Sequence, residues 1–218
     1  MPSFLTEATG KAFHDAIASI EAASSAEIVI AVRGRARRVA APAIAIGLAV
    51  AITMLALTLY ADTEFALWQI FALPIVTGAL GATIAQLGPI ERLLVSPPAR
   101  RAQVRDAART AFYERGVHAT TKRTGVLVFV ALHERVVELV GDVAVVAAVG
   151  QAQLDAWGDL LAAQLAAGGA ATATALAGLA GAFSKKLPNR AGETNELADD
   201  VVDVHQPRGL RRLRGVDA

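Results

Sequence analysis

Residues 39–88 read VAAPAIAIGLAVAITMLALTLYADTEFALWQIFALPIVTGALGATIAQLG, and this stretch decides how the rest of the chain can fold. Residues 39–60 form a run of 22 without a charge, and residues 65–88 form a second run of 24. A helix rises about 1.5 Å per residue, so the first run spans about 33 Å and can cross a hydrocarbon core of about 30 Å. Only residues 61–64 separate the two runs, which predicts a transmembrane helical hairpin.

Basic residues stand on both sides of this hairpin. They are Arg33, Arg35, Arg37 and Arg38 before it and Arg92, Arg100, Arg101 and Arg105 after it. The connection at residues 61–64 carries Asp62 and Glu64 and no Lys or Arg. By the positive-inside rule, both flanks and both termini are expected in the cytoplasm and the connection outside. The sequence therefore predicts a multi-pass protein of the plasma (inner) membrane, with the lipid bilayer as its first partner.

Small residues and a proline give the second run its internal features. Pro74 lies inside the expected helix and should kink it, whereas Gly78 and Gly81 offer positions for close packing against the first helix. The alternative is a buried helical pair in a soluble protein. That alternative fits less well, because buried helices rarely stay uncharged over this length with basic residues at both ends.

The composition limits the function classes. The chain has 218 residues, so the soluble part is of the size of a single domain. A net charge of +1 argues against nucleic acid as a partner. The absence of Cys excludes disulfides, thiolate nucleophiles and zinc–thiolate sites. Residues 1–20 lack the uncharged apolar core of a signal peptide, so the first apolar run should act as the insertion signal.

The chain on either side of the hairpin alternates helices and strands. Apolar residues at intervals of three and four predict a helix over residues 5–23, and residues 27–32 form a buried strand. After a helix that ends at Gly116, residues 125–132 form a continuous apolar run typical of a sheet centre. Residues 133–135 then connect it to an antiparallel strand at residues 136–140. The class is therefore α/β (α+β) with a mixed sheet.

The C-terminal part is expected to contain two further helices and a tail. The helices lie at residues 151–165 and 176–187, separated by Gly168 and Gly169, and a third membrane span over residues 160–183 is rejected because Ala, Gly and Thr contribute little to insertion. Residues 189–218 are polar and weakly periodic, which predicts disorder. We accordingly divide the chain into four segments: the first part of the soluble domain (residues 1–38), the membrane hairpin (39–88), the second part of the soluble domain (89–188) and the tail (189–218).

Three segments together resemble the TPM domain. They are residues 24–30 (SSAEIVI), residues 112–116 and residues 123–142 (RTGVLVFVALHERVVELVGD). The family includes plant thylakoid-lumen proteins linked to photosystem II repair, a nematode membrane protein that modulates acetylcholine receptors, and many bacterial membrane proteins. The resemblance implies a sheet sandwiched by helices in which the strand at residues 27–32 pairs with the strand that begins at Gly125.

The same resemblance bears on activity. The plant relative is associated with acid phosphatase activity and with acidic residues that hold calcium. In this chain residues 33–98 replace part of the family's connection with a membrane hairpin, a form that looks like a bacterial subfamily. The positions that match the family are Glu27, Arg135, Glu138, Gly141 and Asp142. They do not make a complete catalytic set.

Carboxylates at the strand ends are the candidate metal ligands, and they are Asp142, Glu27 and Glu134. Calcium and magnesium both bind carboxylate oxygens. Glu134 and Asp142 stand about 20 Å apart at opposite ends of one strand, so they can share an ion only if a bulge folds the strand back. Asp142, with Glu27 as a companion, is the better candidate. The alternative is that Asp142 only caps a turn.

Cationic and hydroxyl side chains form a candidate anion site, which comprises Lys122, Arg123, Thr124 and Arg135. The alternative is a polar turn that leads into the strand. No phosphate-binding glycine loop, zinc-protease motif or aspartyl-phosphate motif is present in the sequence. We therefore expect a membrane-anchored, cytoplasmic-facing, non-enzymatic binding or accessory module with a protein partner at the membrane. The alternative is a weak metal-dependent acid phosphatase.

Overall fold

The computed structural model describes residues 4–34, 40–87, 96–189 and 201–203. Contacts divide the chain into two compact units. The first, which we call the α+β unit, comprises Met1–Ala36 with Ala102–Ala218, and the second, the hairpin unit, comprises Arg37–Arg101. The α+β unit is therefore assembled from two segments that the hairpin interrupts.

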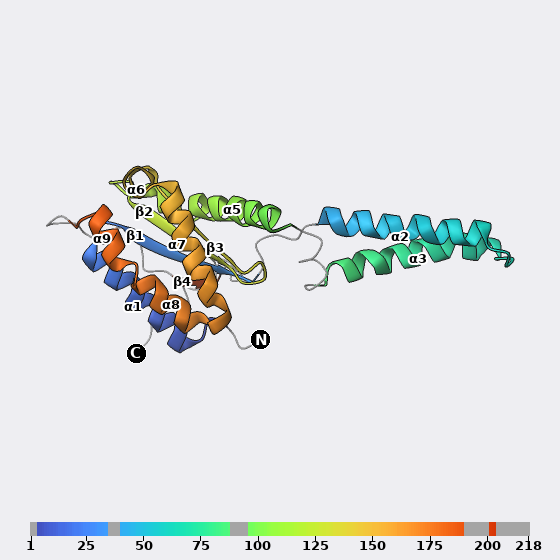
Figure 1. Cartoon of the computed structure of the whole chain (residues 1–218), viewed down its shortest axis with the longest axis horizontal. Coiled ribbons are helices and arrows are strands. Elements are labelled where there is room, and N and C mark those ends of the chain that lie inside the picture. Colours follow the sequence, from blue (N-terminus) through green and yellow to red (C-terminus); the bar gives the residue numbers. More distant parts are fainter. Residues whose placement is uncertain (1–3, 35–39, 88–95, 190–200, 204–218) are drawn as a thin grey trace, which may run out of the picture. The chain divides into compact units, whose positions relative to one another are not determined.

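A four-stranded mixed sheet forms the centre of the α+β unit (Figure 1). Its strands are β1 (Glu27–Arg33), β2 (Gly125–Ala131), β3 (Val136–Gly141) and β4 (Val201–Asp203), in the order β3-β2-β1-β4. β1 runs parallel to β2, with Glu27 opposite Gly125, and β3 runs antiparallel to β2. The predicted pairing of the first strand with the one that begins at Gly125 is confirmed, as is the α/β (α+β) class.

Helices cover both faces of this sheet, which confirms the expected sandwich (Figure 1). One face carries α1 (Glu7–Ala23), α6 (Val143–Val149), α7 (Gln151–Gln164), α8 (Gly169–Ala177) and α9 (Ala180–Lys186), with the short helix η2 (Leu165–Ala167) between α7 and α8. The other face carries α5 (Pro97–Glu114) and the short helix η1 (Val117–Ala119). Alternate residues of β1 enter the two cores: Ile28 and Ile30 face α1, whereas Val29 and Ala31 face α5. Burial on both sides explains why these strands are continuously apolar.

Three elements differ from the sequence prediction. Helix α6 was not expected, and its four valines favour a strand by propensity. The helical region expected at residues 176–187 begins earlier, at Gly169, and is divided into α8 and α9 around Gly178. We expected residues 189–218 to be disordered, but Val201–Asp203 pair with β1 as the parallel strand β4. The rest of that tail lies outside the described residues.

The hairpin unit consists of α2 (Ala40–Tyr60) and α3 (Leu67–Ala85). A Cβ atom added to Gly78 would lie 2.9 Å from the Ala51 Cβ, and one added to Gly81 would lie 3.1 Å from a Val50 methyl group. The predicted close packing at both glycines is confirmed. Gly47 makes a third close approach, since an added Cβ there would lie 2.7 Å from the Gly78 carbonyl oxygen. The connection is longer than expected, because α3 begins at Leu67 rather than at residue 65.

Candidate functional site

Nearly all of the exposed large apolar side chains among the described residues lie on the hairpin unit. Among the described residues, every large apolar side chain that is exposed belongs to residues 44–87, with three exceptions. The exceptions are Tyr113, Val143 and Leu160. Two helices, Pro42–Tyr60 and Leu67–Ala85, are long and apolar enough to cross a membrane. This surface is the candidate lipid contact of the protein.

The threonine hydroxyl groups within these two helices are satisfied without water. Thr53 donates to the Ala49 carbonyl oxygen, Thr77 to that of Leu73 and Thr83 to that of Ala79, at 2.8–2.9 Å. A polar group in hydrocarbon costs free energy unless it has such a partner. The threonines are therefore compatible with a lipid environment.

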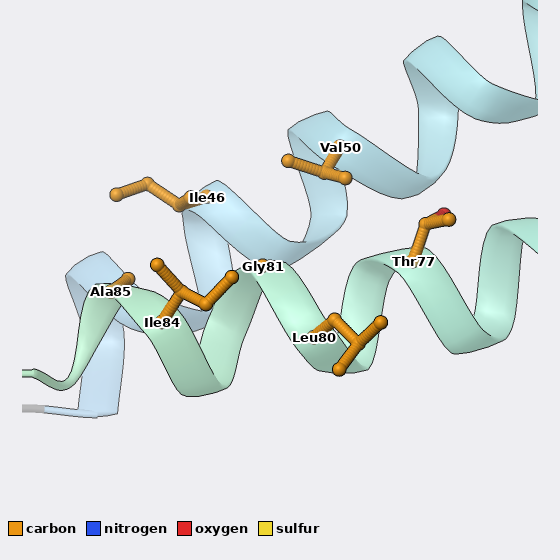
Figure 2. A pocket seen from close by; sticks show the side chains of 7 residues that line it. All are labelled: Ile46, Val50, Thr77, Leu80, Gly81, Ile84 and Ala85. Carbon is orange, nitrogen blue, oxygen red and sulfur yellow. The ribbon is translucent and has the colours of Figure 1, made fainter.

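An apolar groove of about 390 Å³ runs along the hairpin unit (Figure 2). Its lining residues are Ile46 and Val50 from α2 and Thr77, Leu80, Gly81, Ile84 and Ala85 from α3. The lining contains no charged side chain, and its one hydroxyl, on Thr77, already donates to a carbonyl oxygen. The groove therefore suits apolar chains and offers no acid, base or nucleophile.

Asp142 caps a helix and forms an ion pair. Its Oδ1 accepts a hydrogen bond from the Val143 amide at 2.7 Å, at the N-terminus of α6, and its Oδ2 lies 3.5 Å from Nη1 of Arg123. Both carboxylate oxygens are therefore engaged within the fold. Glu27 lies at the same end of the sheet, but β2 separates β1 from β3 and places the two backbones about 10 Å apart. Of the two roles considered for Asp142, metal ligand or cap, the structure shows the cap.

Glu134 lies at the other end of the sheet, in the turn between β2 and β3, and it is buried. As predicted, Glu134 and Asp142 stand at opposite ends of β3, and no bulge brings them together. Within the described part of the chain, no group of three or more His, Asp and Glu side chains is placed to hold a metal ion. Calcium or magnesium binding stays a prediction.

The four residues of the candidate anion site are also divided between the two ends of the sheet. Lys122, Arg123 and Thr124 precede β2, whereas Arg135 precedes β3 at the opposite end. Arg123 donates from Nη1 to the His118 carbonyl oxygen at 2.8 Å and faces Asp142. Thr124 is buried, and its amide donates to the Thr120 hydroxyl. The structure thus separates Arg135 from the other three residues.

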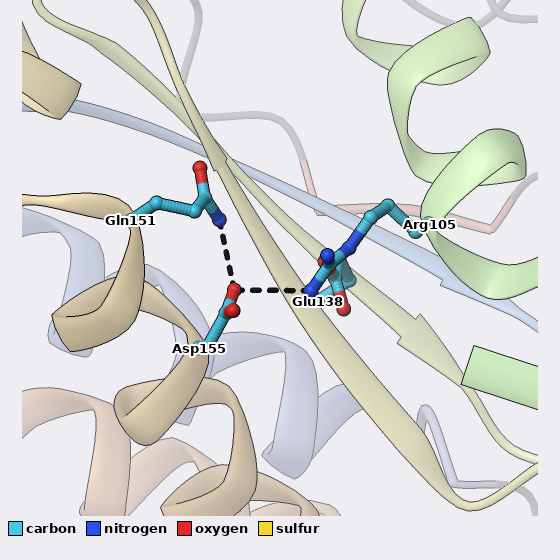
Figure 3. Close-up of polar contacts among 4 residues, drawn as sticks. All are labelled: Arg105, Glu138, Gln151 and Asp155. Carbon is cyan, nitrogen blue, oxygen red and sulfur yellow. Dashed lines mark hydrogen bonds and ion pairs between the residues drawn. The ribbon is translucent and has the colours of Figure 1, made fainter. Parts of the chain in front are cut away.

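A partly buried group of ion pairs, which the sequence did not reveal, joins both faces of the sheet (Figure 3). Arg105 of α5 donates from Nε to Oε1 of Glu138 at 2.5 Å and from Nη2 to Oδ1 of Asp155 at 3.2 Å. Gln151 donates to the same Asp155 oxygen at 2.8 Å. Because β3 is an edge strand, Arg105 reaches past it from α5 on one face to α7 on the other. We call Arg105, Glu138 and Asp155 the edge cluster.

The edge cluster is held by charge. Its Glu138 side chain is 6% exposed, and those of Arg105 and Asp155 are 35% and 34% exposed. The hydrogen bond to Glu138 is the main cause that raises the pKa of Arg105 above its ordinary value. A cation with a raised pKa contributes its stability at every pH below the unfolded-state value, so Arg105 adds no pH dependence near neutrality. A Glu inside the otherwise apolar strand at residues 136–140 was the sequence signal for this cluster.

Comparisons with known proteins indicate the fold. No family model matches the chain, and no curated protein matches it. A similar solved structure is the NMR structure of BA42 protein from the psychrophilic bacteria Bizionia argentinensis sp. nov., with a TM-score of 0.54 and 17% identity. The match covers 91% of this chain and 94% of that one. This likeness supports the α+β fold, and the resemblance to the TPM domain stays a prediction.

The cap at Asp142 leads to a first prediction. Asp142→Ala should lower the free energy of unfolding by about 1–2 kcal/mol, because the Val143 amide loses its acceptor. Asp142→Asn is the matched control. It should lower the free energy of unfolding by only a small part of this amount, since Asn caps helices as well as Asp does. Denaturant unfolding followed by circular dichroism measures both changes. Equal losses in the two variants would contradict a capping role and would point to the carboxylate charge.

Proposed function

We propose that this protein is a membrane-anchored module whose hairpin unit spans the plasma (inner) membrane and whose α+β unit faces the cytoplasm. The observation that supports anchoring most directly is the confinement of exposed large apolar side chains to residues 44–87, with three exceptions among the described residues. Burying such side chains in lipid is favourable by about 25 cal/mol for each Å² removed from water. The basic residues on both flanks support the cytoplasmic orientation.

The α+β unit is proposed to act as a non-enzymatic binding or accessory module. Several of the charged groups around its sheet are engaged with one another. Asp142 caps α6 and faces Arg123, and Arg105 holds Glu138 and Asp155. These contacts are those of groups that stabilise a fold. The role proposed for this unit is to present a surface to a protein or lipid partner at the membrane.

The second prediction tests anchoring and orientation. The protein should remain in the membrane pellet after extraction with alkaline carbonate, and reporter fusions should report opposite sides for Asp62 and Ala218. Alkaline phosphatase should be active when fused at Asp62 and inactive when fused at Ala218. Release of the protein by carbonate would contradict anchoring, whereas activity at Ala218 would contradict only the orientation.

A further inference from the structure

The two edges of the central sheet are protected in different ways. At the β3 edge, helix α7 lies so close that a Cβ atom added to Gly158 would lie 2.6 Å from the Val137 carbonyl oxygen. The edge cluster adds ion pairs at the same edge. Edge strands need such protection because their free amide and carbonyl groups can pair with another chain. The β3 edge is therefore closed by a helix and by charged side chains of the fold itself.

The β1 edge is closed by a short strand from the C-terminal tail. Strand β1 has seven residues, of which five in succession are buried, whereas β4 has three residues. In the sheet, β4 pairs in parallel with Ile30, Ala31 and Val32. The Ile28 amide donates instead to Oε1 of Glu21, in α1, at 3.0 Å. Protection of this edge thus combines one carboxylate with three residues of the tail.

The backbone groups of β1 explain why this edge needs a strand. Neighbouring residues of a strand direct their amides to opposite sides. The Glu27 amide donates to the carbonyl oxygen of the residue before β2, and the Ile28 amide donates to Glu21 on the other side. By this alternation, the backbone groups of Ile30 and Val32 face β4. Both residues are almost fully buried, and buried backbone groups require partners. A strand must therefore lie here, but β4 is not the only strand that would fit.

The connection that leads to β4 is longer than its path requires. Pro188 pairs with Ser24, and Val201 lies opposite Ile30, so the connection advances along β1 by six residues, or about 20 Å. The 13 residue steps from Pro188 to Val201 can span about 45 Å. This surplus length lets β4 leave its edge and return to it at an effective concentration of about 1 mM, which favours it over the tail of a second copy. The tail is thus an internal competitor for the β1 edge.

We propose that β4 is a releasable cover of the β1 edge, and that the open edge takes an extended, β-branched segment of a partner protein in its place. The proposal rests on the binding role proposed above for the α+β unit and names the class of partner. An added strand gains affinity from main-chain hydrogen bonds and specificity from its alternate side chains. A partner segment longer than the three residues of β4 would form more of these bonds.

The third prediction concerns amide hydrogen exchange in the natural full-length chain in detergent. If β4 leaves while the rest of the sheet stays folded, the Ile30 and Val32 amides should exchange about 100-fold faster than those of Val29 and Ala31, which face β2. NMR measures these rates residue by residue, after correction for intrinsic exchange. Equal protection at the four positions would show that β4 opens only with the whole sheet, and the proposal would then be wrong.

A variant in β4 allows a direct binding test on the full-length chain. Val202→Pro removes an amide from the middle residue of β4 and disfavours the strand. It should bind a fluorescent peptide of residues 198–206 (ADDVVDVHQ) about tenfold more tightly than the natural chain, in which the tail closes the edge with about 1.4 kcal/mol. Val202→Ile is the matched control and should bind the peptide as the natural chain does, because it keeps the β propensity. Fluorescence anisotropy measures all three affinities.

The outcomes of the binding test separate a releasable cover from other roles of the tail. A Val202→Pro chain that keeps its melting transition but shows no saturable peptide binding would overturn the proposal. Loss of the cooperative melt in Val202→Pro would also overturn it, because β4 would then be an integral part of the core. A natural dimer that Val202→Pro dissociates would assign the edge to a second copy instead. None of these results affects membrane anchoring, which carbonate extraction tests separately.

Discussion

The C-terminal segment should fail to fold without residues 1–34, which precede the hairpin unit. Expressed alone, residues 97–206 are expected to show no cooperative melt, whereas residues 1–34 joined to 97–206 through a flexible Gly/Ser linker should melt cooperatively. The reason lies in β1, which stands between β2 and β4 and sends side chains into both cores. Without it, the sheet would retain only the β2–β3 pair, and an isolated two-stranded pair is marginally stable at best.

The size of the effect follows from the side chains that would be lost. Those that are almost fully buried include Phe13, Ile17 and Ile20 from α1 and Ile28 and Ile30 from β1. Burying each contributes about 1.5–3 kcal/mol, so these five alone match the 5–15 kcal/mol by which a typical domain is stable. The loss should therefore appear as the absence of a transition rather than as a shifted one.

Thermal unfolding followed by circular dichroism measures the difference between the fragment and the fusion. Ile30→Asp in the fusion places a charge at a fully buried position and should abolish the transition. Lys11→Asp, at an exposed position of α1, is the matched control and should leave it nearly unchanged. A cooperative melt of residues 97–206 alone would show that the two segments do not depend on each other.

This split architecture was predictable because its signals are local in the sequence. The two apolar runs of the hairpin and the continuous apolar strands each carry their own pattern, and the resemblance to the TPM domain supplied the pairing between strands. Glycines at Gly78 and Gly81 likewise indicated where the two hairpin helices pack. Apart from that strand pairing, which joins distant segments, these features depend on spacing along the chain.

The features that were missed depend on tertiary contacts or on competing propensities. The valines of α6 favour a strand, and a helix forms there because Asp142 caps its first turn and Gly150, with φ of 89°, ends it. Strand β4 comprises three residues in a polar tail, and its pairing with β1 leaves no local pattern. At Asp142 the sequence is compatible with a helix cap and with a metal site, and nothing local in it indicates that Arg123 lies opposite the carboxylate.

The edge cluster likewise depends on tertiary contacts that the local sequence does not reveal. Arg105 is separated from Glu138 by 33 residues and from Asp155 by 50, so nothing in the local sequence joins them. Glu138 alone was visible, as a carboxylate inside an apolar strand. A buried carboxylate needs a cation, but the chain offers 21 Lys and Arg residues, and only the packing of α5 against β3 selects Arg105.

Removing that cation should destabilise the α+β unit strongly. Arg105→Met keeps an apolar stem of similar length but leaves the carboxylate of Glu138, 6% exposed, without its partner. Breaking one side of a buried ion pair costs about 3–5 kcal/mol, and the 35% exposure of Arg105 lets water recover part of this, so we expect a loss of about 2–4 kcal/mol. Denaturant unfolding of the full chain in detergent measures the change.

Two further variants show where this loss originates. Asp155→Asn removes the more exposed partner and should cost about 1 kcal/mol or less, as exposed ion pairs do. The double variant Arg105→Met with Glu138→Met replaces the pair by apolar side chains and should recover most of the stability, because it leaves no buried charge behind. If the double variant is as unstable as Arg105→Met alone, the loss comes from the packing of the Arg105 side chain between α5 and β3 and not from the stranded charge of Glu138.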